Sequence, residues 1–429
     1  MAFSVALAVL LLLGAALWIR QLLPSDEAFA AEVASRFEKA SGIGLRVGSA
    51  HWTLRPSPVI VLEDVATVQA RPITVRRLVV RPRLSSLWHR QVSIALIEVD
   101  RATLPRASVR EFRGRWKGEN GPIVLAGAWK LADVPVERVR MRDVTWIDRR
   151  DIALTYDLDL RFDQNWRPRS GEIQRSGITP PARLRIEREG NEDRWRTLID
   201  VADGTWNGTS ELQIDDKGRL RLMAQLTPKN VDVRLLVRSF GRHGVVDGRI
   251  QGQTDIDSEG DNVGELFRRL HTRTRFTVAP ATLMGFDLTK VVTGKSARGG
   301  QTPLDALSGT LDTQNSDDGV ILRYIELKAR SGVLKASGSA TVVNRRLDGE
   351  AAIDVVDGVV GVPLKLGGTL DAPVVSLTGA ALTGAAVGTA VLPGVGTAIG
   401  ARIGQQVDKL LGDEEAKKRS PGAPAPKPR

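Results

Sequence analysis

The segment IALTYDLDLRF, residues 152–162, alternates apolar and polar side chains along almost its whole length. Successive side chains of an extended chain point to opposite sides, so this segment has one apolar side and one polar side. A period of two is typical of a β-strand with a single buried face and does not fit a helix. The residues on the apolar side are Ile152, Leu154, Tyr156, Leu158, Leu160 and Phe162.

Other segments repeat this pattern, with turn residues between them. LQIDDKGRLRLMAQL, residues 212–226, predicts a hairpin whose returning strand carries Leu220, Leu222 and Leu226 on one face. VDVRLLVRS at 231–239 and GRIQGQTDID at 248–257 are predicted strands of the same kind. Because no helix alternates regularly with the strands, we predict a mainly β fold. Its centre is a long, curled, groove-like antiparallel sheet, with a few short helices.

An early strand of this sheet is expected just after two prolines. Pro56 and Pro58 cannot donate backbone hydrogen bonds and suit a strand entrance or edge. The run VIVL at 59–62 is apolar on both of its sides, as in a strand that meets water on neither face. Val59 and Val61 are therefore candidates to line an apolar surface.

The N-terminus predicts a membrane anchor. Residues 1–19 contain no charged side chain, and Trp18 and Arg20 stand where interfacial anchors are expected. At ~1.5 Å per residue this stretch spans about 28 Å, close to the hydrocarbon thickness of a bilayer. We expect a transmembrane anchor at 1–20, and a cleaved signal peptide, suggested by AFAA at 28–31, is the alternative. The nearby basic side chains all follow the anchor, so charge alone does not set its orientation.

The rest of the chain divides by composition. A short amphipathic helix is expected within 21–44, with Ser25 as N-cap, an apolar stripe at Phe29, Val33 and Phe37, and Gly42 as its end. An N-terminal β-groove region follows at 45–260. A C-terminal β region, with a short helix within 261–276, extends over 261–378.

The last fifty residues have a different composition. Residues 372–401 carry no charge, and several glycines recur at intervals of four. We expect a Gly-rich helical segment at 379–412, which either packs inside a membrane or covers the end of a soluble sheet. The tail at 413–429 is charged and then rich in Pro, Ala and Lys, and is expected to be disordered.

Residues that commonly carry catalysis or bind metals are sparse. The chain has no cysteine, and its four histidines lack the spacing of a metal site. The sequence Gly294-Lys295-Ser296 lacks the first glycine of a phosphate-binding loop. Asp157 and Asp159 lie on a strand side that is polar throughout, so solvation explains them. We therefore predict no catalytic residue, no metal, no cofactor and no enzymatic activity.

The net charge of +11 is compatible with an acidic partner, but its distribution argues against nucleic acid. The arginines occur singly along the alternating strands, with no sustained basic block. Stacking on nucleic acid would need aromatic side chains interleaved with arginine on one exposed face. Trp129 and Trp146 have such neighbours, but a chain with a membrane-length N-terminus is poorly placed to meet nucleic acid. No nucleic-acid partner is expected.

The order of several segments resembles the AsmA family of bacterial envelope proteins. After the anchor and the helix come GIGLRVGSAHWTLRPSPVIVLEDVAT and RLVVRPRLSSLWHRQVSIALIEVDRATL. The C-terminal half carries LMGFDLTKVV, TPLDALSGTL, ARSGVLKASGSATVVNRRLDGE and VPLKLGGTLDAPVVSLT, between residues 283 and 378. The middle, about 110–260, resembles the family only in its β-rich character, and the chain lacks basic side chains before the anchor.

This resemblance implies a single-pass protein of the bacterial inner membrane, with most of the chain in the periplasm and a role in outer-membrane biogenesis. AsmA-like proteins are similar to bridge-like lipid-transfer proteins. The resemblance therefore implies membrane lipids as partners, whose acyl chains bind or move along an apolar groove, and other envelope proteins as further partners. It brings no catalytic residue. The candidate lining residues are Val59, Val61, Ile152, Leu154, Tyr156, Leu158, Leu160, Leu220, Leu222 and Leu226.

The alternative is a two-sheet β-sandwich whose apolar faces bury each other. Such a protein would bind no lipid and would act as a periplasmic assembly factor that aids the insertion of outer-membrane proteins.

Overall fold

A computed structural model of the chain describes most of the residues between Ser25 and Leu377. The described residues are 25–53, 58–87, 91–112, 124–125, 129–148, 151–163, 167–241, 244–287, 298–316, 319–332, 334–355, 362–369 and 372–377. The anchor expected at 1–20, the Gly-rich segment at 379–412 and the tail at 413–429 lie outside them. Among the helices that are described, none has the length and apolar character needed to cross a membrane.

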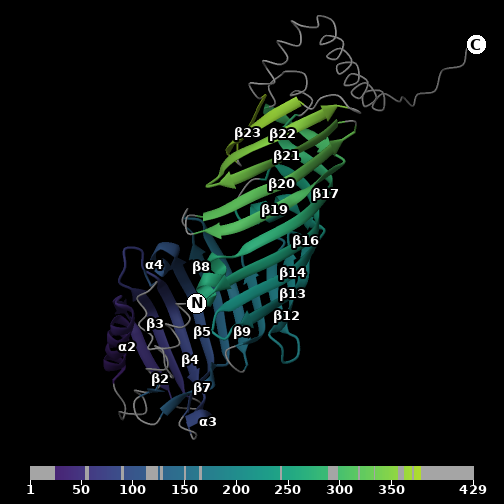
Figure 1. The fold of residues 1–429 in the computed structure, drawn as a ribbon. Helices are drawn as coiled ribbons and strands as arrows, with labels where there is room; N and C mark the ends of the chain where they lie inside the picture. The colour runs from purple at the N-terminus through teal and green to yellow at the C-terminus, as the bar shows by residue number, and fades with distance from the viewer. Residues whose placement is uncertain are drawn as a thin grey trace, which may run out of the picture. The chain divides into compact units, whose positions relative to one another are not determined.

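The described residues form mainly β-structure, as the sequence predicts (Figure 1). They fall into two compact units. The strands that lie in the first unit are β1 (Leu45–Arg46), β2 (Ser49–Thr53), β3 (Val59–Thr67), β4 (Thr74–Pro82), β5 (Gln91–Pro105), β6 (Val124–Leu125), β7 (Trp129–Val136), β8 (Arg138–Ile147), β9 (Ala153–Phe162), β10 (Pro168–Arg175), β11 (Ala182–Arg188), β12 (Arg194–Val201), β13 (Gly204–Ile214), β14 (Leu220–Lys229) and the second half of β16 (Val246–Gly260).

The sheet of the first unit is mixed. Strands β3, β4 and β5 pair antiparallel, and so do the successive strands from β8 to β14, followed by β16. Between these two sets β5 pairs with β7 and β8 in parallel. The connection from β5 to β8, residues 106–137, is long enough for the crossover that parallel strands require. The wholly antiparallel sheet expected from the sequence is therefore wrong at β5.

Helix α2 (Asp26–Ser41) confirms the predicted amphipathic helix. The hydroxyl of Ser25 accepts a hydrogen bond from the Ala28 N–H at 3.3 Å, and Gly42 ends the helix with a left-handed backbone at φ 67°. Its buried stripe of Phe29, Val33 and Phe37 matches the spacing of one helical face. In Figure 1 the helix lies beside the first strands, where Phe29 and Val33 pack into the main apolar cluster of this unit.

The apolar face of the first strands does not follow strict alternation. Asp64 on β3, Arg101 on β5 and Asp143 on β8 have left-handed backbones, with φ of 50°, 51° and 56°. The pairings place these three at one level of the sheet. As a result, the residue two positions before each of these three and the residue directly after it lie on the same side of the sheet. Leu62 and Val65, Val99 and Ala102, and Met141 and Val144 all belong to one apolar cluster.

The second unit is an antiparallel sheet. It contains the first half of β16, most of β17 (His271–Phe286), β18 (Arg298–Leu304), β19 (Ala306–Ser316), β20 (Gly319–Ser331), β21 (Leu334–Val343), β22 (Arg346–Val355), β23 (Val362–Thr369) and β24 (Ala372–Leu377). Successive strands from β19 to β24 pair antiparallel, as the second β-rich block predicts. Val278, Ala281 and Leu304 form a small buried cluster in this unit.

Residues 231–239 are a correction to the sequence analysis. The expected strand is present only as β15 (Val231–Asp232), and helix α5 (Val233–Ser239) follows directly. The Asp232 carboxylate accepts a hydrogen bond from the Leu235 N–H at 2.8 Å, as a helix N-cap does. Val233 packs against the Val278 cluster. A capping aspartate and packing of Val233 against this cluster thus outweigh the apolar alternation of this short segment.

The expected curl is also corrected. In neither unit do the described pairings bring the last strand back to the first, and the sheet is uncurled. Alternation tells which side of a strand is apolar. The bending of a sheet depends instead on bulges and on what packs against its faces. The described strands all belong to a single sheet, so a facing second sheet, as in the sandwich alternative, is not found among them.

Candidate functional site

One face of the first unit is apolar across many consecutive strands. The register places Met141 on β8 opposite Leu158 on β9, and Leu158 opposite Ile173 on β10. Ile173 in turn lies opposite Leu184 on β11, and Leu184 opposite Ile199 on β12. A parallel row runs from Val139 through Leu160 and Gly171 to Ile186. Neighbouring side chains in these rows stand on the same face of the sheet.

The glycine in the second row lets the two large side chains beside it meet. A Cβ atom at Gly171 would lie 2.6 Å from Leu160 Cδ2 and 3.0 Å from Ile186 Cγ1. Leu160 and Ile186 therefore close over the glycine from the two adjoining strands. The apolar surface is continuous at this point because position 171 has no side chain.

Protein covers this apolar face at both ends of the run of strands. On β3 to β5 the facing side chains are buried in the cluster that Phe29 and Val33 of α2 join, for example Ile97 and Val99 at 2% exposure each. On the other side, helix α6 (Val263–Arg268) packs against β14, and the Ser258 hydroxyl of β16 donates a hydrogen bond to the Leu266 carbonyl at 2.6 Å. Ser258 lies opposite Leu222, on the apolar face.

Two tryptophans lie across the apolar face between these covered regions. Trp206 on β13 donates a hydrogen bond from its indole N–H to the Thr254 hydroxyl on β16 at 3.0 Å, so its ring crosses β14. Leu226, on β14 opposite Thr254, is buried at 4% exposure. Trp195 on β12 reaches across β11 in the same way and donates to the Pro168 carbonyl. The indole rings therefore act as local covers of the sheet.

Between α2 and Trp206 lies a set of apolar side chains that are only half-buried. All of them stand on β8 to β12 and face the same side. We call this set the open apolar patch; it consists of Met141, Leu154, Tyr156, Leu158, Leu160, Ile173, Leu184, Ile186 and Ile199. A contiguous apolar surface that stays partly open to solvent is typical of a binding site.

The structure brings together only some of the residues that the sequence analysis selected. Leu154, Tyr156, Leu158 and Leu160 belong to the open apolar patch. Ile152 lies just before β9, where its N–H donates to the Asp148 carboxylate.

The remaining selected residues lie elsewhere. Leu220 and Leu222 share the apolar face but stand on β14, against α6, and Leu226 is covered by Trp206. Val59 and Val61 pair with Thr53 and His51 and stand on the opposite side of β3 from the buried Ile60 and Leu62. The lining role of all ten selected residues stays a prediction. The five residues named in this paragraph lie outside the open apolar patch.

Sequence reasoning missed several members of the patch. Ile173, Leu184, Ile186 and Ile199 occur on short strands in which arginine and glutamate are frequent, so each strand alone gives a weak apolar signal. Their alternation, for example Leu184 and Ile186 in ARLRIER, is the signal that could have found them. A further member of this face, Arg175, is polar and could not have been found by any apolar pattern.

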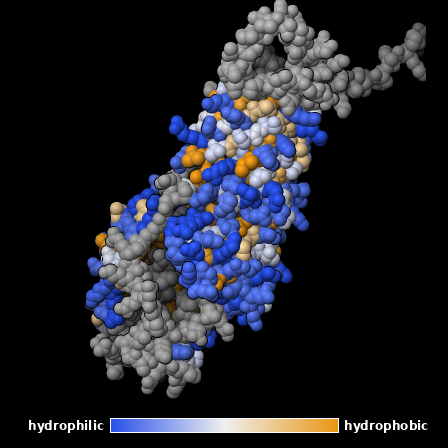
Figure 2. Space-filling view, in the orientation of Figure 1, coloured by the Kyte–Doolittle hydropathy of each residue, from blue (hydrophilic) through white to orange (hydrophobic). Residues whose placement is uncertain are grey.

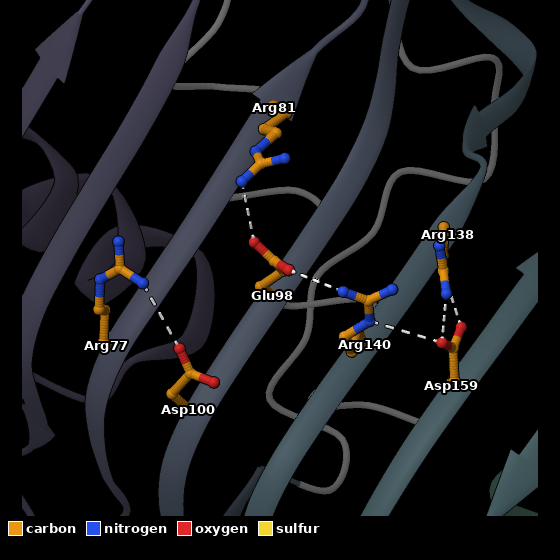
Figure 3. Close-up of polar contacts among 7 residues, drawn as sticks. All are labelled: Arg77, Arg81, Glu98, Asp100, Arg138, Arg140 and Asp159. Carbon is orange, nitrogen blue, oxygen red and sulfur yellow. Dashed lines mark hydrogen bonds and ion pairs between the residues drawn. The ribbon is translucent and has the colours of Figure 1, made fainter.

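The opposite face carries ion pairs across the strands (Figure 3). Glu98 on β5 lies 3.3 Å from both Arg81 and Arg140, and Arg140 lies 3.5 Å from Asp159 on β9. Arg138 donates two hydrogen bonds to the Asp159 carboxylate. Figure 2 likewise shows predominantly hydrophilic residues over strands β12 to β14. The arginines of these ion pairs thus lie on the polar face of the sheet.

Asp157 and Asp159 have structural partners on this polar face. The Asp157 carboxylate accepts from the Asp143 N–H and from the Ser176 hydroxyl, both at 2.8 Å. The hydrogen bond from Arg138 lowers the pKa of Asp159, and the same pair raises the pKa of Arg138. Among the described residues no group of acidic and histidine side chains could hold a metal ion.

Replacing Asp159 with asparagine is expected to lower the free energy of unfolding by about 1 kcal/mol at pH 7, since the pair is partly exposed. Because the folded-state pKa of Asp159 is lowered, its contribution is present above the unfolded-state pKa and is lost as the pH falls through the folded-state value. Urea unfolding at pH 7 and below pH 4 measures both effects. The difference between wild type and Asp159→Asn should shrink at the lower pH; a constant difference would contradict this assignment.

A polar hollow lies at one end of strands β8 to β12. It is lined by residues that include Glu137, Arg161, Phe162, Arg169 and Asn191. Arg188 at its wall lies 2.7 Å from Asp163 and 2.8 Å from Asp193, and Arg167 lies 2.8 Å from Asp193. Its charges are therefore largely compensated within the protein, which makes the hollow a weaker candidate for ligand binding than the open apolar patch.

No protein family model matches the chain, and the comparisons found no similar curated protein and no similar solved structure.

Proposed function

We propose that this protein binds the acyl chains of membrane phospholipids on the open apolar patch. It would do so as an inner-membrane-anchored periplasmic protein of outer-membrane biogenesis. The observation that carries the proposal is the half-buried row from Met141 through Leu158, Ile173 and Leu184 to Ile199. Such a surface gains free energy when hydrocarbon covers it, at roughly 25 cal/mol per Å² removed from water.

The size of the patch suits an acyl chain. Five strands at ~4.8 Å spacing are about 20 Å across. One acyl chain fills about half of the ~30 Å hydrocarbon thickness of a bilayer. A chain lying across β8 to β12 would therefore be in contact with apolar side chains over its length. In this proposal an apolar patch on an uncurled sheet takes the place of the groove expected from the sequence.

The assembly-factor alternative requires the apolar face to be sealed by a second sheet. The described strands supply no such sheet, and the covering elements found in the first unit are α2, α6 and two indole rings. Nothing in the described residues favours the alternative over lipid binding.

Mass spectrometry of the full chain purified in mild detergent tests the proposal directly. We expect phospholipid to be retained through extensive washing at a stoichiometry of about one or more per chain. A protein that carries no lipid, and takes up none from added phospholipid vesicles, would contradict the proposal.

A photo-crosslinking amino acid placed at Leu158 is expected to form a lipid adduct, because this side chain stands in the middle of the open apolar patch. The matched control is Arg161 on the same strand, which is exposed on the polar face. Adducts are detected by mass spectrometry after irradiation of the full chain in membranes. Equal labelling at the two positions would show that lipid contact does not depend on the face.

A further inference from the structure

Arg175 is a charged side chain on an otherwise apolar face. The register places it opposite Tyr156 on β9 and Ala182 on β11, at the end of β10. It therefore stands on the same side of the sheet as Leu158 and Ile173, next to the open apolar patch. At ~3.4 Å per residue along the strand, Arg175 is about 7 Å from Ile173.

Two of the three guanidinium nitrogens of Arg175 have no hydrogen-bond partner among the described residues. Its Nε and Nη1 atoms are buried and make no hydrogen bond. Shielding guanidinium N–H groups from water without a hydrogen-bond acceptor costs free energy, and arginines that are partly buried in proteins are normally paired. A buried donor with no acceptor in the folded chain points to an acceptor that comes from outside.

Arg188 shows how this fold satisfies a structural arginine. It stands on the next strand, β11, opposite Trp195, and is also largely buried. Its guanidinium contacts the carboxylates of Asp163 and Asp193 and donates to two backbone carbonyls. Arg175 has none of these partners, so packing in the same unit does not explain its presence.

We propose that Arg175 binds the phosphate of a lipid head group while the acyl chains of that lipid cover the open apolar patch. The inference rests on the proposed function and adds the head-group chemistry to it. A phosphate offers acceptor oxygens that fit the planar fork of a guanidinium. The position of Arg175 beside Tyr156, at the margin of the patch, is where the polar end of a bound lipid would lie.

Two lipids that differ only in the phosphate test this proposal. The full chain is stripped of lipid in detergent, and its affinities for dioleoyl phosphatidic acid and for dioleoylglycerol are measured. Wild type is expected to bind phosphatidic acid about tenfold to a hundredfold more tightly. Arg175→Gln should bring this ratio close to one and leave the affinity for dioleoylglycerol unchanged.

Arg185→Gln is the matched control. Arg185 lies on the neighbouring strand and loses the same charge, but it is exposed on the polar face, 3.1 Å from Asp200. This variant should keep the wild-type ratio. An equal loss in Arg185→Gln would mean that overall charge, and not Arg175, sets the preference, and would overturn the inference.

The outcomes separate this inference from the proposed function. If wild type binds both lipids equally, or if Arg175→Gln keeps the preference, lipid binding stands and the role of Arg175 is overturned. If wild type binds neither lipid, the proposed function is contradicted, and the inference about Arg175, which rests on it, is overturned as well. Binding of inorganic phosphate through Arg175 without binding of phosphatidic acid would also overturn the lipid assignment.

The stability of a second variant tests whether Arg175 has a hidden structural role. Removing a guanidinium whose shielded N–H groups have no acceptor should not destabilise the protein, so lipid-free Arg175→Met is expected to melt at or above the temperature of wild type. A clearly lower melting temperature would show that the guanidinium is satisfied by the protein itself, and would overturn the inference.

Discussion

Leu184→Glu is expected to lose most of the bound phospholipid while it keeps the fold. Leu184 lies in the middle of the row that joins Ile173 to Ile199 and is only half-buried. Without lipid, a glutamate there can reach solvent. With lipid in place, its carboxylate would be pressed against hydrocarbon. Placing an acidic side chain in hydrocarbon costs on the order of 3 kcal/mol, which corresponds to a roughly hundredfold loss of affinity.

The control for this variant is Arg185→Glu. It changes the charge by two units where Leu184→Glu changes it by one, but it acts on the polar face of the same strand. We expect its retained lipid, measured by mass spectrometry, to match that of wild type. If both variants lose lipid to the same extent, net charge governs retention and the open apolar patch is not the binding surface. Circular dichroism of each variant checks that the strands are retained.

Ile97→Ala is expected to destabilise the protein by about 3–4 kcal/mol, because a fully buried side chain is replaced by a cavity. Ile97 lies between Val80 on β4 and Val139 on β8, in the cluster that Phe29 and Val33 of α2 join. Leu184→Ala, made in the open apolar patch, should cost only about 1–1.5 kcal/mol in lipid-free protein. Urea unfolding of both variants, after removal of lipid, measures the contrast.

The comparison of Ile97→Ala with Leu184→Ala distinguishes a side chain that protein surrounds from one that is left for lipid to cover. The two substitutions remove side chains of the same size, so a large difference in cost reflects how completely protein surrounds each one. Adding back phospholipid should stabilise wild type more than Leu184→Ala, since ligand binding to the folded state adds to stability. Equal costs for the two variants in lipid-free protein would mean that protein already seals the patch, which contradicts the proposed function.

The elements that the sequence predicted well depend on local signals. The strand at 153–162, the hairpin around residues 215–218 and helix α2 have their full signal within a few neighbouring residues. At the hairpin, the Asp215 carboxylate accepts the N–H groups of Lys217 and Arg219, so the turn is encoded by its own residues. The same holds for Ser25 and Gly42 at the ends of α2.

The errors arise where the signal is long-range. The run at 59–62 is apolar on both sides, so alternation could not decide which side of β3 faces the core, and the structure buries Ile60 and Leu62 there. Likewise the parallel pairing of β5 with β8 depends on where a connection of many residues returns the chain. A short apolar run at 231–239 formed a helix once Asp232 capped it.

The sequence by itself determined which segments become strands, which side of most strands is apolar and where α2 begins and ends. These properties follow from the period of the side chains and from capping and turn residues, which act over a few positions. Only the tertiary structure decided which apolar residues are sealed and which stay open. That depends on α2, α6, Trp195 and Trp206 lying over some rows of the sheet and not others. The position of Arg175 on the apolar face was likewise decided by the tertiary structure, because it follows from the register of β10 with β9.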